Sequence, residues 1–240
     1  MTATPTTHRN ELAESESQLL AALDQPPEWA AHPSGLPGWS RGHVVAHLLG
    51  NAEGLLNLII WARSGVPTPM YPSADARSAA IDERSQWPLS RLRGALAEKV
   101  AEFAAACTNL VEPLAAHDLE MRSGASVEAW EIPMLRIREV EIHRVDLADG
   151  YSADDWSSAF TLRTIPQVHR TFIARGDMPV ASIRAADTGR VWSFEEPESH
   201  PAKPDLLGSE ADLLAWLIGR PHGPLRTSDG TPLPVAPRWV

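Results

Sequence analysis

The sequence predicts an α+β protein in which a four-helix bundle is followed by a small unit of mixed helices and strands. Over residues 1–150, four long stretches carry apolar residues at every third or fourth position, which is the period of an amphipathic helix. After Gly150 the pattern changes to short alternating stretches separated by turn residues, as is typical of strands. We therefore expect a helical domain over 1–150 and a small α+β domain over 151–240.

The expected helices of the first domain begin and end at recognisable signals. Ser40 is a good N-cap for a long helix, and Gly65 is a good end for the same helix. Pro133 lies in the first turn of the last helix, where its missing N–H is harmless, and Gly150 follows the end of that helix. Residues 111–127 are expected to be irregular or weakly strand-like. The expected helices cover residues 7–23, 40–64, 74–86 (short, with mixed charge), 89–110 and 130–149.

The second domain is expected to combine helices and strands. A helix over 154–175 should be interrupted or kinked at Pro166, because proline cannot donate a backbone hydrogen bond. Two strands should form a hairpin around a turn at 187–189. The proline-rich tail, 230–240, could supply an edge strand or a wrapped extension. The remaining expected elements are strands at 180–186, 190–194 and 204–208 and a helix at 210–218.

Composition and charge restrict the class of protein. The net charge of −10 argues against a nucleic-acid or anionic-membrane partner, either of which needs a basic surface. An anionic substrate would then need a local positive group or a cation. The single cysteine excludes an internal disulfide framework, and the N-terminus has no apolar signal core. The longest apolar stretch, 44–61, is broken by polar residues, so we expect a soluble, cytoplasmic protein without a membrane partner.

Glu139 and His143 are the first candidates for a metal site. They are four residues apart, so a helix places both side chains on one face, which also carries apolar residues. Two ionisable groups among apolar neighbours are costly to bury unless something satisfies them, and a divalent metal bound to both would do so. The alternative is an exposed pair that contributes roughly 0.2–0.5 kcal/mol. The spacing by itself leaves both interpretations open.

Histidines in the 40–64 helix offer a third ligand. His47 lies in an apolar stripe and should point inward, where a lone histidine is more often a hydrogen-bonded core residue than a ligand. His43 precedes it by four residues, so a chelate of both is a competing arrangement, which ranks lower because His43 lies at the edge of the stripe. Cys107 continues the apolar row of the 89–110 helix and is expected to be a packed core thiol, not a nucleophile.

Four segments carry a resemblance to a known family. They are Gly38-Trp39-Ser40-Arg41 with the residues that follow to Ala52, Thr68-Pro69-Met70-Tyr71, Arg138-Glu139-Val140-Glu141-Ile142-His143 with the residues to Leu147, and Gly219-Arg220 with Pro237-Arg238-Trp239. In this order and spacing they resemble the mycothiol-dependent maleylpyruvate isomerases, which belong to the DinB-like metal-binding bundles. The resemblance covers nearly the whole chain. It implies a DinB-like four-helix bundle and a C-terminal unit similar to sterol-carrier-type domains.

The resemblance implies a zinc site whose ligands are His47, Glu139 and His143. It also assigns an important role to Arg220, at the junction of the two domains, and all four residues are present. Three protein ligands leave a fourth tetrahedral position open, as in catalytic zinc sites. Asp146 is then expected to form a salt bridge, because a fourth ligand would close the site.

The implied activity is the cis–trans isomerisation of maleylpyruvate to fumarylpyruvate, a step of aromatic degradation. Zinc would lower the pKa of a bound thiol. Because Cys107 is a poor candidate for this thiol, a small cofactor is expected to supply it, and the resemblance identifies that cofactor as mycothiol. The thiolate would add to the conjugated double bond, and its expulsion after rotation would leave the trans isomer. Arg220 could stabilise the enolate oxygen or bind a substrate carboxylate, with a helix-capping role as its alternative. Asn51, one turn beyond His47, is a candidate contact of the thiol.

The expected partners are therefore a small dicarboxylate and a low-molecular-weight thiol, and the expected state is a monomer or a weak homo-oligomer. Three alternatives remain. A mycothiol S-transferase would consume the thiol on another electrophile, in detoxification or secondary metabolism. A zinc hydrolase would use water in the open position, but no H-E-x-x-H is present and no glutamate neighbours His47. A metal-stabilised binding module would lose its fold without zinc and would show no turnover.

Overall fold

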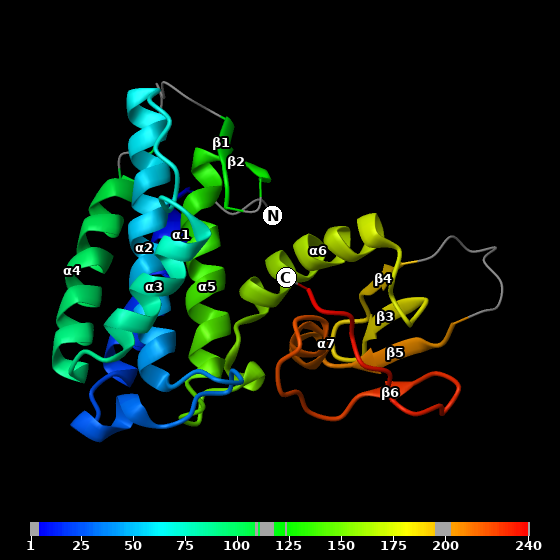
Figure 1. Cartoon of the computed structure of the whole chain (residues 1–240). Coiled ribbons are helices and arrows are strands. Elements are labelled where there is room, and N and C mark those ends of the chain that lie inside the picture. The colour runs from blue at the N-terminus through cyan, green and yellow to red at the C-terminus, as the bar shows by residue number, and fades with distance from the viewer. Residues whose placement is uncertain (1–4, 109, 111–117, 123, 195–202, 240) are drawn as a thin grey trace. The chain divides into compact units, whose positions relative to one another are not determined.

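The computed structural model describes residues 5–108, 110, 118–122, 124–194 and 203–239. Within it the chain separates into two units, Met1–Ala148 and Asp149–Val240 (Figure 1). The described part of the first unit consists of helices and one short hairpin, and that of the second combines helices with a four-stranded sheet. The α+β class predicted from the sequence is confirmed.

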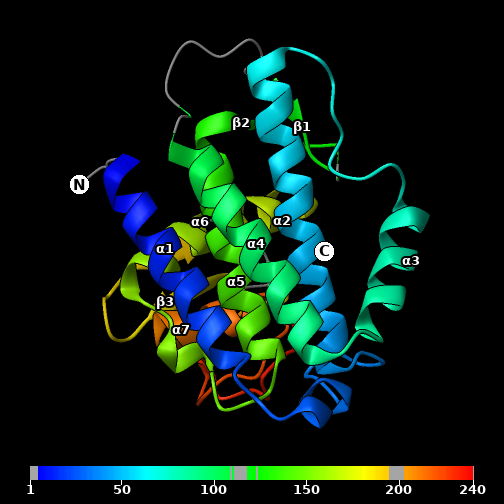
Figure 2. The ribbon, with the colours of Figure 1, turned by 90° about the vertical axis from the view of Figure 1, so that its left-hand side faces the viewer.

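The described residues of the N-terminal unit form α1 (Pro5–Ala22), α2 (Arg41–Ser64), α3 (Ala74–Ser85), α4 (Leu89–Thr108) and α5 (Ile132–Asp146), with 3-10 turns at Pro27–Ala31 and Ala129–Glu131. α2 contacts α4 and α5, and α1 contacts the same two helices, so these four close into a ring. Two views of the ribbon show them running side by side (Figure 1 and Figure 2). The shorter α3 packs against α2 from outside the ring. The predicted four long helices and the short one are confirmed.

The ends of α2 follow from two local signals. At its start the backbone N–H of Ser40 donates to Nδ1 of His43 at 3.1 Å, which closes the first turn. At its end Gly65 adopts a left-handed conformation with φ 70°, and its N–H donates to the carbonyl of Trp61 at 2.9 Å. A residue with a Cβ atom is strained in this conformation, so glycine is the favoured residue at this position.

α2 is the central helix of the core. Val44, Leu48, Leu55 and Leu58 on this helix are fully buried. Among the described helices, α2 alone is long and apolar enough to cross a membrane, but 67% of its most apolar window is buried inside the protein. The apolar composition of α2 is therefore explained by its burial, since a helix that packs on several neighbours is apolar on most of its sides.

A buried ion pair connects three helices of the bundle. Arg136 of α5 is fully buried, and its Nε lies 2.6 Å from Oε1 of Glu16 on α1. Its Nη1 donates to the carbonyl of Leu48 and to Oδ1 of Asn51, both on α2, at 2.7 and 2.9 Å. These contacts fix the rotation of α5 against α2, and therefore the direction in which the side chains of the next turn of α5 point.

A short antiparallel hairpin precedes α5. Strand β1 (Asp118–Glu120) pairs with β2 (Ser126–Glu128), and Leu119 lies opposite Val127. Both apolar side chains are buried while their neighbours are exposed, as in a strand with one buried face. The weakly strand-like prediction is confirmed for this part of the chain, and residues 111–117 lie outside the described residues.

The described residues of the C-terminal unit form α6 (Ser158–Arg175), α7 (Glu210–Leu217), a 3-10 turn at Ala153–Asp155, β3 (Ser182–Ala185), β4 (Val191–Ser193), β5 (Asp205–Gly208) and β6 (Arg226–Thr227). The order of the strands in the sheet is β4-β3-β5-β6. β3 and β4 form the predicted antiparallel hairpin, β5 runs parallel to β3, and β6 is antiparallel to β5. α7 contacts α6 as well as β3 and β5.

α6 continues past its proline. It begins after the N-cap Ser157, not at 154, and it is not interrupted at Pro166. The proline removes one helical hydrogen bond. Val168 and Phe172, beyond the proline, are fully buried, so packing stabilises the continued helix.

The tail does not supply the edge strand of the sheet. That strand is β6, and residues 230–239 form no strand. Pro232 and Pro234 lack the N–H that a strand ladder needs. The tail is instead held by Nε1 of Trp216, which donates to the carbonyl of Pro234 at 2.9 Å, so it is the wrapped extension that was the second prediction.

Candidate metal centre

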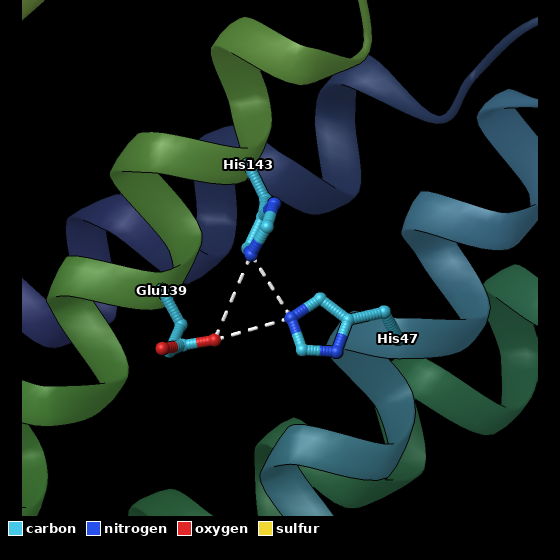
Figure 3. A group of neighbouring side chains, drawn as sticks. All are labelled: His47, Glu139 and His143. Carbon is cyan, nitrogen blue, oxygen red and sulfur yellow. Dashed lines mark hydrogen bonds and ion pairs between the residues drawn. The ribbon is translucent and has the colours of Figure 1, made fainter. Parts of the chain in front are cut away.

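Three ionisable side chains from α2 and α5 converge on one point (Figure 3). Nε2 of His47 lies 3.1 Å from Oε2 of Glu139 and 2.9 Å from Nε2 of His143. Oε2 of Glu139 and Nε2 of His143 are 3.7 Å apart. The four-residue spacing on α5 places Glu139 and His143 on one face, and the contact of α2 with α5 brings His47 to them. The structure thus brings together the three side chains that were named as ligands from the sequence.

The geometry of the three side chains fits a tetrahedral zinc ion. Ligand atoms bound at about 2.0–2.2 Å in a tetrahedron lie about 3.3 Å from one another. The three separations, 2.9, 3.1 and 3.7 Å, lie on either side of this value. Two imidazoles and one carboxylate are also a donor set of catalytic zinc sites. Among the described residues, no other three His, Cys, Asp or Glu side chains are close enough to share an ion.

A carboxylate orients the imidazole of His143. Oδ2 of Asp146, which is buried, lies 2.7 Å from Nδ1 of His143. The carboxylate accepts the proton of Nδ1, which leaves the lone pair on Nε2, the nitrogen that faces His47 and Glu139. Metal-binding histidines usually have such a partner on their second nitrogen. With a neutral imidazole this contact is a hydrogen bond, and it becomes the salt bridge expected from the sequence only when His143 is protonated.

The second nitrogen of His47 faces an arginine that the sequence did not reveal. Nη2 of Arg77, on α3, lies 2.9 Å from Nδ1 of His47. A guanidinium only donates hydrogen bonds, so this contact uses a lone pair on Nδ1. The two residues are 30 positions apart on different helices, and α3 shows only mixed charge. No spacing or motif in the sequence pointed to this contact.

Burial and neighbouring groups favour the protonation states that bind metals. Burial, together with His143, lowers the pKa of His47 to about 4, so its imidazole is neutral at neutral pH. Burial alone would raise the pKa of Glu139, but its interactions with His47, and also with His143 and Arg138, bring that pKa well below the usual value. A neutral imidazole and an ionised carboxylate are the forms that coordinate zinc.

We expect the free energy of unfolding of the metal-free protein to fall as the pH is lowered from 6.5 to about 4. The unfolded chain protonates His47 near pH 6.5, whereas the folded protein does so near pH 4, so protonation between these values favours unfolding. The lowered pKa corresponds to a loss of about 3 kcal/mol. Urea unfolding with a chelator present, at about pH 7 and about pH 4.5, measures this loss. His47→Gln should reduce it, and an unchanged loss in that variant would contradict the assignment to His47.

Two other candidates on α2 have different contacts. Asn51 is buried one turn beyond His47, but its Oδ1 accepts a hydrogen bond from Arg136 inside the bundle. Its contact with a thiol stays a prediction. Nδ1 of His43 accepts from the N–H of Ser40 and lies 2.8 Å from the hydroxyl of that serine. His43 therefore closes the first turn of α2, and the structure does not bring it into the group of three.

The last two candidates lie elsewhere in the chain. Cys107 is buried on α4, and burial raises the pKa of its thiol to about 12, as expected for a packed core thiol. Arg220 belongs to the C-terminal unit, where its Nη1 donates to the carbonyl of Ile218 at 2.8 Å, next to the end of α7. This is the helix-capping contact that was the alternative for Arg220. Its role toward a substrate stays a prediction.

Comparisons with known proteins identify the family of this fold. The family model described as mycothiol maleylpyruvate isomerase N-terminal domain matches residues 9–148. A crystal structure of the mycothiol-dependent maleylpyruvate isomerase is similar with a TM-score of 0.91 and 26% identity, over 99% of this chain and 98% of that one. A histidine-to-alanine mutant of the mycothiol-dependent maleylpyruvate isomerase gives 0.90 and 25% over the same shares. A comparison with curated proteins gave no match. The chain belongs to the mycothiol maleylpyruvate isomerase family.

Proposed function

We propose that the protein is a zinc- and mycothiol-dependent cis–trans isomerase that converts maleylpyruvate into fumarylpyruvate by reversible addition of the mycothiol thiolate to the double bond. The observation that carries this proposal is the convergence of His47, Glu139 and His143, with their ligand atoms 2.9–3.7 Å apart. Membership of the family supports the choice of thiol and substrate.

In this proposal the three side chains hold the zinc ion and leave the fourth position to the thiol. A zinc ion held there would lower the pKa of a bound thiol, so that mycothiol would be present as the thiolate at neutral pH. The low pKa of His47 keeps its imidazole neutral, which is the charge state that coordinates a metal. Asp146 holds the proton of His143 on Nδ1, which keeps Nε2 available as a ligand atom.

Two residues are proposed to act on the substrate and the thiol. Arg220 would bind a substrate carboxylate or stabilise the negative charge that develops on the substrate oxygen. Asn51 would contact the thiol through its amide nitrogen, because its Oδ1 already accepts from Arg136.

The same proposal describes the cellular setting. The partners are a small dicarboxylate and a low-molecular-weight thiol, in the cytoplasm, without nucleic acid or membrane. The net charge of −10 and the single cysteine support this assignment. The proposed state is a monomer or a weak homo-oligomer.

The protein's own thiol is expected to be dispensable for turnover. Because burial raises the pKa of Cys107 to about 12, this thiol is protonated at neutral pH and cannot act as the nucleophile. Cys107→Ser and Cys107→Ala should therefore keep the kcat of the wild type, measured in the isomerase assay with equal zinc content. A large loss of kcat in a folded variant would mean that the nucleophile belongs to the chain.

An absorbance assay on zinc-loaded protein tests the proposed function. Maleylpyruvate should be converted to fumarylpyruvate only when mycothiol is added, and the thiol concentration should not change during the reaction. Consumption of the thiol would instead indicate an S-transferase. Absence of conversion by a protein that holds zinc and binds mycothiol would contradict the isomerase.

A further inference from the structure

A cavity of about 260 Å³ lies between α2, α3 and the loop that joins them. His47 forms part of its wall, so the cavity adjoins the candidate metal centre. Arg77 and Arg84 reach it from α3 and Glu53 reaches it from α2, while apolar groups such as Met70 line much of the rest. Its volume lies just below the range of about 300–1,000 Å³ that holds drug-sized ligands, so it suits a small acid.

The two arginines that line the cavity, Arg77 and Arg84, differ in their contacts. Nη1 of Arg84 lies 2.7 Å from Oε2 of Glu53, so these two charges compensate each other. Arg77, in contrast, has no carboxylate within ion-pair distance in the part of the chain that the structure describes. It contacts Nδ1 of His47 and lies over the ring of Tyr71, 5.6 Å from the centroid. In a chain with a net charge of −10, this is a local positive group of the kind that an anionic substrate needs.

The contact between Arg77 and His47 is incompatible with a metal on Nε2 of that histidine. A neutral imidazole that binds a metal through Nε2 carries its proton on Nδ1. Nδ1 is then a donor, and a guanidinium has no acceptor for its hydrogen bond. When His47 serves as a ligand, the guanidinium of Arg77 must therefore turn away from the ring. The space into which the guanidinium can turn is the cavity, because both Arg77 and His47 line its wall.

We propose that Arg77 binds one carboxylate of the substrate in this cavity once it has left Nδ1 of His47. The inference rests on the proposed function, which supplies the zinc ion and the dicarboxylate. A guanidinium matches a carboxylate with two parallel hydrogen bonds, whereas a lysine offers only a point charge. Arg77 is then a residue that determines specificity, because a substrate without a carboxylate leaves this charge without a partner.

Calorimetric titration of the full-length, zinc-loaded protein with maleate tests the proposal. Maleate carries two carboxylates on a cis double bond, and leaving out mycothiol removes the nucleophile that the proposed reaction needs. Arg77→Met should weaken maleate binding roughly 10- to 100-fold, as expected for the loss of a charged hydrogen-bonded pair. Arg77→Lys should restore part of the affinity.

The chain offers a matched control in the same cavity. The double variant Glu53→Gln/Arg84→Met removes one charge of each sign, so the net charge of the cavity is unchanged. It should bind maleate like the wild type. Zinc binding is the second readout: Arg77→Met should hold zinc at least as tightly as the wild type, because no guanidinium then competes for the lone pair of Nδ1.

Equal maleate affinity of the wild type and Arg77→Met would overturn the proposal, as would no binding of maleate by the zinc-loaded wild type. Loss of zinc from Arg77→Met would also overturn it, because Arg77 would then support His47 and not the substrate. Turnover separates this inference from the proposed function. If the wild type does not convert maleylpyruvate although maleate binding depends on Arg77, the isomerase assignment fails and the carboxylate site stands.

Discussion

Glu139→Ala is expected to abolish zinc binding and isomerase turnover together. Oε2 of Glu139 is one of only three ligand atoms in the group, 3.1 Å from His47 and 3.7 Å from His143. It is also the only carboxylate among them, so its loss removes the negative charge that offsets the charge of the ion. The loss of zinc affinity should exceed the roughly 10- to 100-fold loss that follows from removing a residue that only hydrogen-bonds to a ligand.

Zinc content by elemental analysis and turnover of maleylpyruvate with mycothiol measure this effect. His47→Ala should behave like Glu139→Ala. Asp146→Asn should lower the zinc affinity less, by roughly 10- to 100-fold, because Asp146 only hydrogen-bonds to the ligand His143. Glu102→Ala is the matched control, because Glu102 lies on α4 and pairs with Lys99. It should retain zinc and turnover. Full activity in a variant that holds no metal would refute the zinc mechanism.

Glu16→Ala is expected to cause a large loss of stability in the N-terminal unit. Arg136 is fully buried, and Glu16 is its ion-pair partner at 2.6 Å. Removing one partner of a buried pair leaves the other charge without compensation, which costs about 3–5 kcal/mol. The contacts of Arg136 with the carbonyl of Leu48 and with Asn51 remain, but neither group carries a negative charge.

Urea unfolding in the presence of a chelator measures this loss without a contribution from bound metal. Glu14→Ala is the matched control, since Glu14 lies on the same helix and is exposed. Its effect should stay within about 0.5 kcal/mol. The double variant Glu16→Ala/Arg136→Met should recover part of the stability, because neither charge is then buried. If Glu16→Ala is no more destabilising than Glu14→Ala, the buried pair does not hold the bundle together.

Most of the fold could be predicted from the sequence because a helix is recognised from residues that are close together in the chain. The periods of apolar residues and the signals at Ser40 and Gly65 located the helices to within a few residues. The edge strand β6 was not predicted, since it has only two residues and pairs with β5 alone. A strand this short has no period of its own to detect.

In the candidate site, too, some features follow from residues within one helix and others only from the packing of separate helices. By itself the sequence determined that Glu139 and His143 share a helix face and that His47 points inward, because both depend on spacing within one helix. It also determined which family the chain resembles, because the segments that carry the resemblance can be read in order along the chain. Only the tertiary structure decided that His47 meets the other two through Nε2, that Arg77 reaches its Nδ1, and that Asn51 contacts Arg136. Which ring nitrogen meets which partner depends on how far each packed helix is rotated about its axis and how closely it approaches its neighbour. Spacing along the chain gives the face on which a residue lies, but the rotation and the approach of separate helices result from the packing of the whole core.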